Sequence, residues 1–428
     1  MEYADPFAIL PLEIIREILL YFDLKTRMKI VAVSKRWRNL ASALPELWRD
    51  MDFSIAIGHR IQPRHAKALI QRSQHTTSRA VLTNMSTRTA WTIMEDLNGC
   101  SSSLESLRMD VNVDSFRQEP LNFHNFENLR CLTTSDQFGM KFSDLRKLLE
   151  HCRYIEEIDV CIGIERKTVD LSTLPRAPHL KFFSLASRPY YDPDLILPCV
   201  DYNCKEGKTL ADIFPSLEEF YLSDILLSAH PRLEGLSCLR RFGLLNIKAN
   251  MFHGDDLILP STLEYLSLSH SVPFYTMAVQ QLPNLKSLVL NRADCIFESV
   301  WNEWTANMNE QLTNIDIEEV FEPKVVAYLI RTALEGRLRS VENLNMGGLF
   351  VNDDVIATIV PEMPNLKTIN ISETRVTSQG IECLVNAGLP LEKVTARCLR
   401  HGQEGIAYAR AAGVEVDTFT STRLQKRK

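Results

Sequence analysis

The sequence predicts an α/β protein in which a small three-helix domain at the amino terminus packs onto a long repeat solenoid. Two observations predict this fold. Within the first fifty residues, apolar residues recur at three- and four-residue steps in three short segments, each preceded by a helix-start signal. From there to the end of the chain, a unit of the form apolar-x-x-apolar-x-apolar returns, mostly every 22 to 29 residues.

The first helix is expected to begin at Pro11, because proline is well suited to a first helical position. Asp23 and Ser34 have the side chains that cap helices, so they predict the starts of the second and third helices. A unit of about 40 residues rarely forms a stable core alone. The surplus apolar surface of these helices must therefore meet something else.

The same region carries an ordered set of motifs, Leu10-Pro11-Leu12-Glu13-Ile14 with Ile18, then Val33-Ser34-Lys35-Arg36-Trp37, then Leu47-Trp48. This order resembles the F-box family. Departures are Phe22, where Leu is common, and Thr26-Arg27-Met28, where the family is more aliphatic. The resemblance implies that the helices pack on a Skp-type adaptor, which joins them to a cullin–RING ubiquitin ligase.

The resemblance also implies which side chains contact the adaptor, although some of them must instead fill the interior of the helices. These candidates are Leu10, Pro11, Ile14, Ile15, Ile18, Val33 and Trp37.

The later repeats have the period of leucine-rich repeats, and about 12 to 14 of them are expected. Each would give a short strand with its apolar residues inward and its alternate residues outward. Stacked strands form a parallel sheet on a concave face, with helices or irregular turns behind it. The clear units begin at Leu104, Leu129, Ile155, Leu180, Leu217, Leu239, Leu263, Leu285, Leu312, Val341, Leu366 and Leu391.

Return helices are expected over residues 143–152, 297–307 and 403–412 and from Pro323 onward, and irregular returns between Leu217 and Leu285. Trp48, Met51 and Phe53 already have the repeat spacing, so the first domain is expected to merge into the solenoid. The predicted organisation is an F-box over residues 1–50, a solenoid over 51–417 and a disordered basic tail over 418–428.

The register predicts a mixed polar concave face suited to a protein segment, in which any single residue could equally be a solvated side chain. An insertion of about twelve residues near 186–212 either adds a binding loop or is a neutral surface insertion. The candidate substrate-binding residues are Tyr190, Tyr191, Tyr221, Arg241, Tyr265, Asn291, Asn314 and Asp316. Trp301 and Trp304 could form an aromatic anchor, with burial as the alternative.

No catalytic motif is present, and no cofactor or metal is expected. Cys199 and Cys204 are the only hint of zinc, against plain loop cysteines. Cys152 is expected in the core and not as a reactive thiol.

A net charge of −6 argues against nucleic-acid binding, and no membrane span or signal peptide is evident. A cytoplasmic or nuclear location is expected, the basic tail being a weak import signal.

Together these observations predict a non-catalytic substrate-recognition subunit of an SCF-type ubiquitin ligase. In this reading the F-box binds the adaptor and the repeats bind a protein target. Two alternatives remain open. One is an adaptor-binding regulator that acts without ubiquitylation, and the other is a leucine-rich-repeat scaffold with no ligase role.

Overall fold

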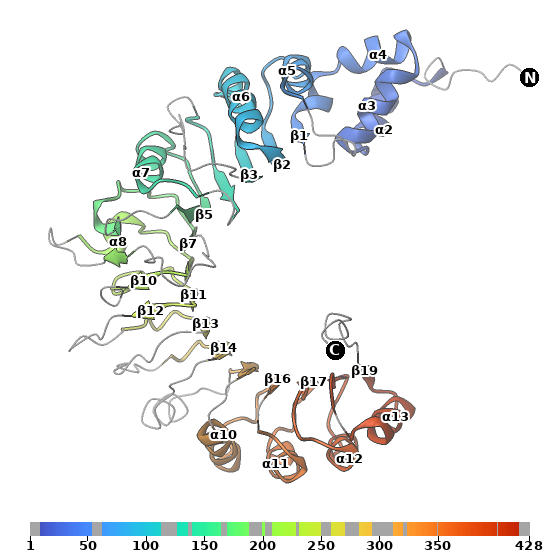
Figure 1. Ribbon diagram of the computed structural model, residues 1–428, viewed down its shortest axis with the longest axis vertical. Helices are drawn as coiled ribbons and strands as arrows, with labels where there is room; N and C mark the ends of the chain where they lie inside the picture. Colours follow the sequence, from blue (N-terminus) through green and yellow to red (C-terminus); the bar gives the residue numbers. More distant parts are fainter. Residues whose placement is uncertain are drawn as a thin grey trace, which may run out of the picture. The chain divides into compact units, whose positions relative to one another are not determined.

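Figure 1 shows a computed structural model of the chain. The residues that the structure describes are 9–53, 62–112, 126–135, 139–163, 169–187, 199–201, 208–227, 231–249, 258–269, 282–292, 311–319, 323–348, 350–399 and 401–418.

The amino-terminal helices form where the sequence predicts them. Asp23 accepts a hydrogen bond from the Thr26 N–H at 2.7 Å, and Ser34 accepts one from the Trp37 N–H at 3.1 Å. Both predicted caps are confirmed. Pro11 has an extended ψ of 149°, so it precedes the first helix and does not start it. The elements are α2 (Leu12–Leu20), α3 (Leu24–Val33), α4 (Lys35–Ser42) and the short 3-10 helix η1 (Pro45–Trp48).

The chain divides into two compact units, and the first contains these helices together with the early repeats. Its strands pair in parallel in chain order, and α5, α6 and α7 lie on the same side of them (Figure 1). The strands are β1 (Asp50–Asp52), β2 (Arg79–Ser86), β3 (Ser106–Asn112), β4 (Cys131–Thr134), β5 (Glu157–Ile162) and β7 (Phe182–Ser187). The helices are α5 (Pro63–Arg72), α6 (Thr87–Leu97), η2 (Asn98–Cys100) and α7 (Phe142–His151).

The amino-terminal helices continue directly into this parallel sheet. Strand β1 follows η1 and pairs with β2, with Met51 opposite Ala80. Trp48 and Met51 are fully buried, and the Trp48 indole N–H donates to the Ala41 carbonyl at 2.9 Å. One apolar core is therefore shared by the helices and the first repeats, as the spacing of Trp48, Met51 and Phe53 predicts.

The described residues of the second unit include a parallel sheet of nine strands, again paired in chain order. They are β9 (Glu219–Ser223), β11 (Arg241–Leu245), β13 (Tyr265–Ser269), β14 (Ser287–Val289), β15 (Asn314–Asp316), β16 (Asn343–Asn345), β17 (Thr368–Asn370), β18 (Lys393–Thr395) and β19 (Glu415–Asp417). The helices behind the later strands are α10 (Pro323–Leu334), α11 (Asp353–Ile359), η4 (Val360–Glu362), α12 (Ser378–Asn386) and α13 (Gln403–Ala411).

Repeat register explains how this sheet is stabilised. Leu222 pairs with Leu244, which pairs with Leu268, and all three are buried. Alternate residues on the same strands face outward, because side chains of a strand alternate between its two faces. We call the side formed by these outward residues of β9 to β19 the open face. No unit could bury its apolar side alone, but stacked units bury it continuously.

Tight packing between the last helices depends on glycine. A Cβ at Gly405 of α13 would lie 2.7 Å from the carbonyl oxygen of Ser378, the first residue of α12. The helices can approach this closely only because that side chain is absent.

Among the described residues, a left-handed residue follows most of the strands from β9 to β19, five positions after the first residue of the strand. The residue donates its N–H to a carbonyl of the next repeat in several cases, such as Glu373 to Arg397 at 2.9 Å. Gly348 suits this conformation, but the other six residues carry side chains. They are Asp224, Asn246, Arg292, Glu319, Glu373 and Cys398.

The segment around the predicted insertion has some regular structure. Strand β8 lies within it and pairs in parallel with β10, which pairs with β12. The short elements here are β6 (Val169–Asp170), η3 (Leu171–Thr173), β8 (Cys199–Asp201), α8 (Leu210–Ile213), β10 (Leu226–Leu227) and β12 (Lys248–Ala249). The predicted helix over 297–307, with Trp301 and Trp304, lies outside the described residues, as does the tail from residue 419.

Candidate functional site

The amino-terminal helices carry most of the exposed large apolar side chains. Of twelve such residues in the described parts of the chain, seven lie between positions 9 and 33. They are Ile9, Leu10, Leu12, Ile14, Tyr21, Phe22 and Val33. Such a concentration of apolar side chains marks a surface for a partner, because scattered exposure would need no explanation.

Helix geometry separates the exposed side of α2 from its buried side. Ile15 and Leu19, four residues apart, are 2% and 1% exposed and fill the interior. Ile14, Ile18 and Tyr21, at steps of four and three, lie on a neighbouring side. Of these, Ile14 is 48% exposed and Tyr21 is 90% exposed. The helix thus presents an apolar edge to solvent after its own core is filled.

The predicted adaptor contacts divide accordingly. Leu10, Pro11, Ile14 and Val33 are exposed, and Ile18 and Trp37 are partly exposed. Their role in binding stays a prediction.

Ile15 needs a correction, because its side chain packs inside the helices and is not available at the surface. The sequence motif contains both Ile14 and Ile15, and only the helical phase tells them apart.

Four members of the exposed apolar set are not among the predicted contacts, namely Ile9, Leu12, Tyr21 and Phe22. The sequence contains a signal for them. The apolar stripe of α2 is wider than the surface that this helix needs for packing on its two short neighbours.

A buried arginine supports this surface. Arg27 is 9% exposed, and its Nε donates to the Leu19 carbonyl at 3.1 Å. One terminal nitrogen donates to the Leu20 carbonyl at 3.0 Å, and the other donates to the Leu47 carbonyl. Two of these carbonyls, Leu19 and Leu20, lie at the end of α2, and the third, Leu47, lies in η1. Arg27, on α3, therefore joins α2, α3 and η1.

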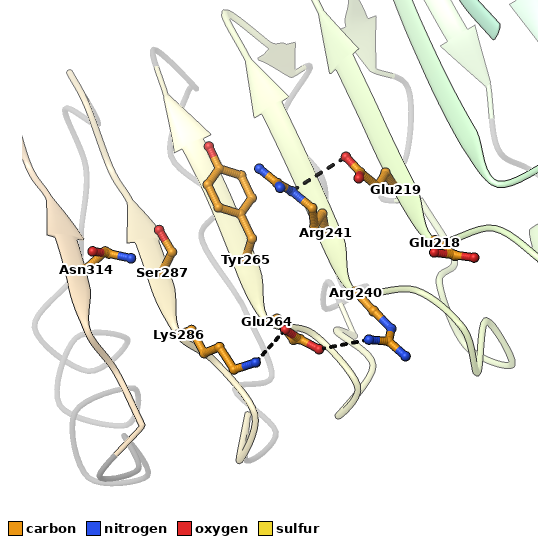
Figure 2. Close-up of a pocket in the computed structure, with 9 residues that line it drawn as sticks. All are labelled: Glu218, Glu219, Arg240, Arg241, Glu264, Tyr265, Lys286, Ser287 and Asn314. Carbon is orange, nitrogen blue, oxygen red and sulfur yellow. Dashed lines mark hydrogen bonds and ion pairs between the residues drawn. The ribbon is translucent and has the colours of Figure 1, made fainter. Parts of the chain in front are cut away.

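On the open face of the second unit, a hollow of about 390 Å³ lies across β9, β11, β13, β14 and β15 (Figure 2). Four of the predicted substrate-binding residues come together at or beside it, namely Tyr221, Arg241, Tyr265 and Asn314. The lining residues are Glu218, Glu219, Arg240, Arg241, Glu264, Tyr265, Lys286, Ser287 and Asn314.

Arg241 is held in place by three neighbouring residues. Its Nε donates to the Tyr221 hydroxyl at 3.0 Å, and that hydroxyl donates to Glu219 at 3.1 Å. Its guanidinium carbon lies 4.7 Å from the centre of the Tyr265 ring, an arrangement typical of a cation–π contact. Burial, and then the charge of Glu219, raise the pKa of Tyr221 to about 12, so the phenol stays protonated at neutral pH.

Gly243 provides the space for this arrangement. A Cβ at this position would lie only 2.6 Å from the Tyr221 ring. The missing side chain lets the ring lie over the neighbouring strand, where its hydroxyl meets Arg241. The sequence pattern could not predict this contact, since it depends on the pairing of Tyr221 with Gly243 across the adjacent strands β9 and β11.

Charges alternate along the edge of the hollow. Glu264 pairs with Lys286 at 2.7 Å and with Arg240 at 3.4 Å (Figure 2). The hydrogen bond from Lys286, with the charges of Lys286 and Arg240, lowers the pKa of Glu264. These exposed pairs contribute little to stability. They do, however, engage Arg240 and Lys286, which are two of the three cationic side chains that line the hollow.

Further along the open face, Asn291 and Asp316 belong to an amide ladder. Asn291 donates to Asp316 at 3.2 Å and accepts from the Glu318 N–H at 3.0 Å. Asn370 donates to Asn345 at 2.7 Å in the next strands. Asn291 and Asp316 therefore bond to each other beyond the hollow and do not line it.

The remaining sequence candidates give no site in the described residues. Tyr190, Tyr191 and Cys204 lie outside those residues. No cluster of three or more potential metal ligands occurs within them. Cys152 is buried, its thiol donates to the Phe126 carbonyl at 3.1 Å, and burial raises its pKa to about 12. Among the described helices, none has the length and apolar character needed to cross a bilayer.

Residues 7–54 match the family model described as F-box-like. No curated protein sequence matches the chain. Among solved structures, an internalin (InlF) from Listeria monocytogenes is similar, with 10% identity and a TM-score of 0.44. The match covers 90% of this chain and 95% of the internalin. TLR13 in a complex with ssRNA13 is similar with 14% identity and a TM-score of 0.42, over 76% of this chain and 49% of the receptor.

The assignment of the remaining repeats rests on the chain's own register. Parallel strands recur in step with the apolar-x-x-apolar-x-apolar unit, and the unit's apolar positions are buried in strand after strand. The chain therefore has an F-box-like domain, followed by a solenoid of parallel strands with the period and apolar spacing of leucine-rich repeats.

Proposed function

We propose that this protein is the substrate-recognition subunit of an SCF-type ubiquitin ligase. The exposed apolar side chains of α2 and its surroundings bind a Skp-type adaptor, and through it the cullin–RING scaffold. The open face of the repeats binds a protein target. The chain itself supplies no catalytic group and works in the cytoplasm, the nucleus or both.

The observation that carries this proposal is the concentration of exposed apolar residues on an F-box-like domain whose core is already filled. Full burial of an apolar side chain contributes about 1.5–3 kcal/mol. Several such side chains at one partner surface supply enough free energy for stable binding, even after the entropic cost of association.

The mechanism is one of proximity. The amino-terminal helices share a core with the first repeats through Trp48 and Met51, which limits their movement against those repeats. Because one chain carries both binding surfaces, a target held by the repeats is kept close to a ubiquitin-conjugating enzyme on the same scaffold. Holding two reactants together lowers the entropic part of the barrier to their reaction.

The test is affinity purification of the tagged full-length chain, followed by detection of adaptor and cullin. Replacing both Leu10 and Ile14 with Asp is expected to abolish recovery of both partners, because two charges would be buried in an apolar interface. Leu334→Asp is the matched control, since Leu334 is exposed on α10 in the second unit and should be neutral. Failure of the wild type to recover the adaptor would refute the proposal.

The same experiment separates the alternatives. An adaptor-binding regulator would recover the adaptor without the cullin. A pure repeat scaffold would recover neither. Equal recovery by wild type and the double variant would show that another surface makes the contact.

A further inference from the structure

The open-face hollow contains one arginine whose terminal nitrogens are not used by the protein. Arg241 bonds to Tyr221 through Nε, and its closest carboxylate contact, Glu219 at 3.5 Å, is also through Nε. Among the described residues, none accepts a hydrogen bond from its two terminal nitrogens. By contrast, Arg397 in the same unit donates a terminal nitrogen to Asp417 at 2.6 Å. The side chain of Arg241 is 48% exposed, so this free end is accessible.

Arg241 is also unusually well oriented for an exposed side chain. Tyr221 fixes its Nε, Tyr265 lies against its guanidinium, and Gly243 makes room for Tyr221. An arginine on a flexible stem loses about 2 kcal/mol of rotamer entropy when a ligand immobilises it. Here the fold has already removed much of that freedom, so a ligand would bind at a smaller entropic cost.

Charge decides which ligand fits. The lining residues include three carboxylates and three cations, and Glu264 already holds both Arg240 and Lys286. A phosphate dianion would meet Glu218, Glu219 and Glu264 with only the terminal nitrogens of Arg241 to balance it, and Glu219 already lies 3.5 Å from the Nε of that arginine, so repulsion disfavours the dianion. A singly charged carboxylate needs only one guanidinium, whose two parallel N–H groups match its two oxygens.

The neighbouring lining residues suit the rest of a peptide. Ser287 and Asn314, on the strands beyond Tyr265, carry small polar groups that can donate and accept hydrogen bonds (Figure 2). The Tyr265 ring offers apolar surface beside the guanidinium. An extended segment lying across these strands would meet all of these groups in order.

We propose that the hollow binds an aspartate or glutamate side chain in an extended segment of the target protein, and that the terminal nitrogens of Arg241 hold its carboxylate bidentately. This inference rests on the proposal that the open face is the target-binding face. It adds the chemical class that the site selects.

The probe is a library of random 12-residue peptides displayed on phage and selected on the full-length chain. Selected peptides are expected to share one acidic position. Changing that residue to Gln or Asn should weaken binding by about tenfold or more, since hydrogen bonds between charged groups are about twice as strong as neutral ones. Replacing it with phosphoserine should not strengthen binding.

Variants of the chain locate the contact. Arg241→Gln should weaken the acidic peptide by about tenfold or more, whereas the Gln form of the peptide should bind wild type and variant equally. Gly243→Ala should weaken the acidic peptide severalfold by displacing Tyr221. Arg397→Gln is the control and should have no effect. Thermal melting of each variant checks that it folds.

The inference is overturned if no acidic position is shared, if selection gives no binder, or if the acidic residue can be neutralised without loss. Tighter binding of the phosphoserine peptide would make the hollow a phosphate site instead. These outcomes are independent of the adaptor. If the chain selects acidic peptides but recovers no adaptor, this inference stands and the ligase role is refuted. If the chain recovers the adaptor but selects no acidic peptide, the ligase role stands and this inference is refuted.

Discussion

Arg27 offers the sharpest test of how the amino-terminal helices are held together. Its guanidinium donates to the carbonyls of Leu19, Leu20 and Leu47, which come from two different elements. Desolvation on burial lowers the pKa of Arg27, partly offset by Asp50 and then Asp23, yet an arginine remains charged in proteins. The perturbation is Arg27→Gln, which keeps a polar group but cannot reach three carbonyls from one position.

The magnitude follows from those hydrogen bonds. The Leu19 carbonyl also accepts from the Phe22 N–H at 3.3 Å and keeps that bond. A glutamine amide is expected to reach at most one of the Leu20 and Leu47 carbonyls, which leaves the other without its donor. Each such acceptor costs about 1–3 kcal/mol, and a hydrogen bond to a charged donor contributes about 1.5–3 kcal/mol. Relief of the buried charge offsets part of the loss. The expected net destabilisation of the helices is about 3 kcal/mol.

Hydrogen exchange of the amides in α2 and α3 is the appropriate assay, because a repeat protein need not unfold in a single step. A loss of about 3 kcal/mol should reduce protection of these amides roughly a hundredfold, since every 1.4 kcal/mol is a factor of ten. The matched control is Arg16→Gln, which removes one exposed ion pair with Glu46 and should cost less than about 1 kcal/mol. Protection in Arg27→Gln within about threefold of wild type would refute the reasoning.

Three further predictions concern the repeats. Glu373 has a φ of 59°, so Glu373→Gly should stabilise the second unit by up to about 1 kcal/mol. Gly348→Ala places a side chain in the same conformation and should destabilise the unit. The two substitutions should therefore shift the melting temperature in opposite directions. Gly405→Ala should destabilise the α12–α13 pair by about 1–3 kcal/mol, because its Cβ would clash with Ser378, and hydrogen exchange in α13 should report the loss. Glu264 has a lowered pKa, so its contribution to stability is present above its ordinary value of 4.5 and is lost as the pH falls. Melting temperatures of wild type and Glu264→Gln, measured from about pH 7 down to about pH 3, should therefore converge at acid pH, and a constant difference would contradict this assignment.

Features set by local chemistry and simple periodicity were predictable from the sequence. Asp23 and Ser34 cap helices because their side chains reach the first free N–H groups, and both caps form as predicted. The parallel sheet follows from the repeated apolar spacing, since each strand can bury its leucines only by stacking on another. Tyr221, Arg241 and Tyr265 were expected on the outward side for the same reason.

Features that depend on contacts between elements were not predictable. Arg27 is charged and stands in an otherwise unremarkable segment, so only the positions of three carbonyls around it explain its burial. Ile14 and Ile15 look alike in sequence and differ by one helical step. The close approach of Tyr221 to Gly243 requires the register of two strands. Glu373 in a left-handed turn contradicts residue preference and is imposed by the repeat.

Direct titration of the full-length chain with a purified Skp-type adaptor tests the central claim most directly. The account predicts saturable binding with one adaptor per chain. It also predicts that Ile14→Asp weakens this binding at least about tenfold, because a charge replaces an apolar side chain at the interface, whereas Leu334→Asp leaves it unchanged. Absence of adaptor binding by the wild-type chain, or equal binding by Ile14→Asp, would contradict it.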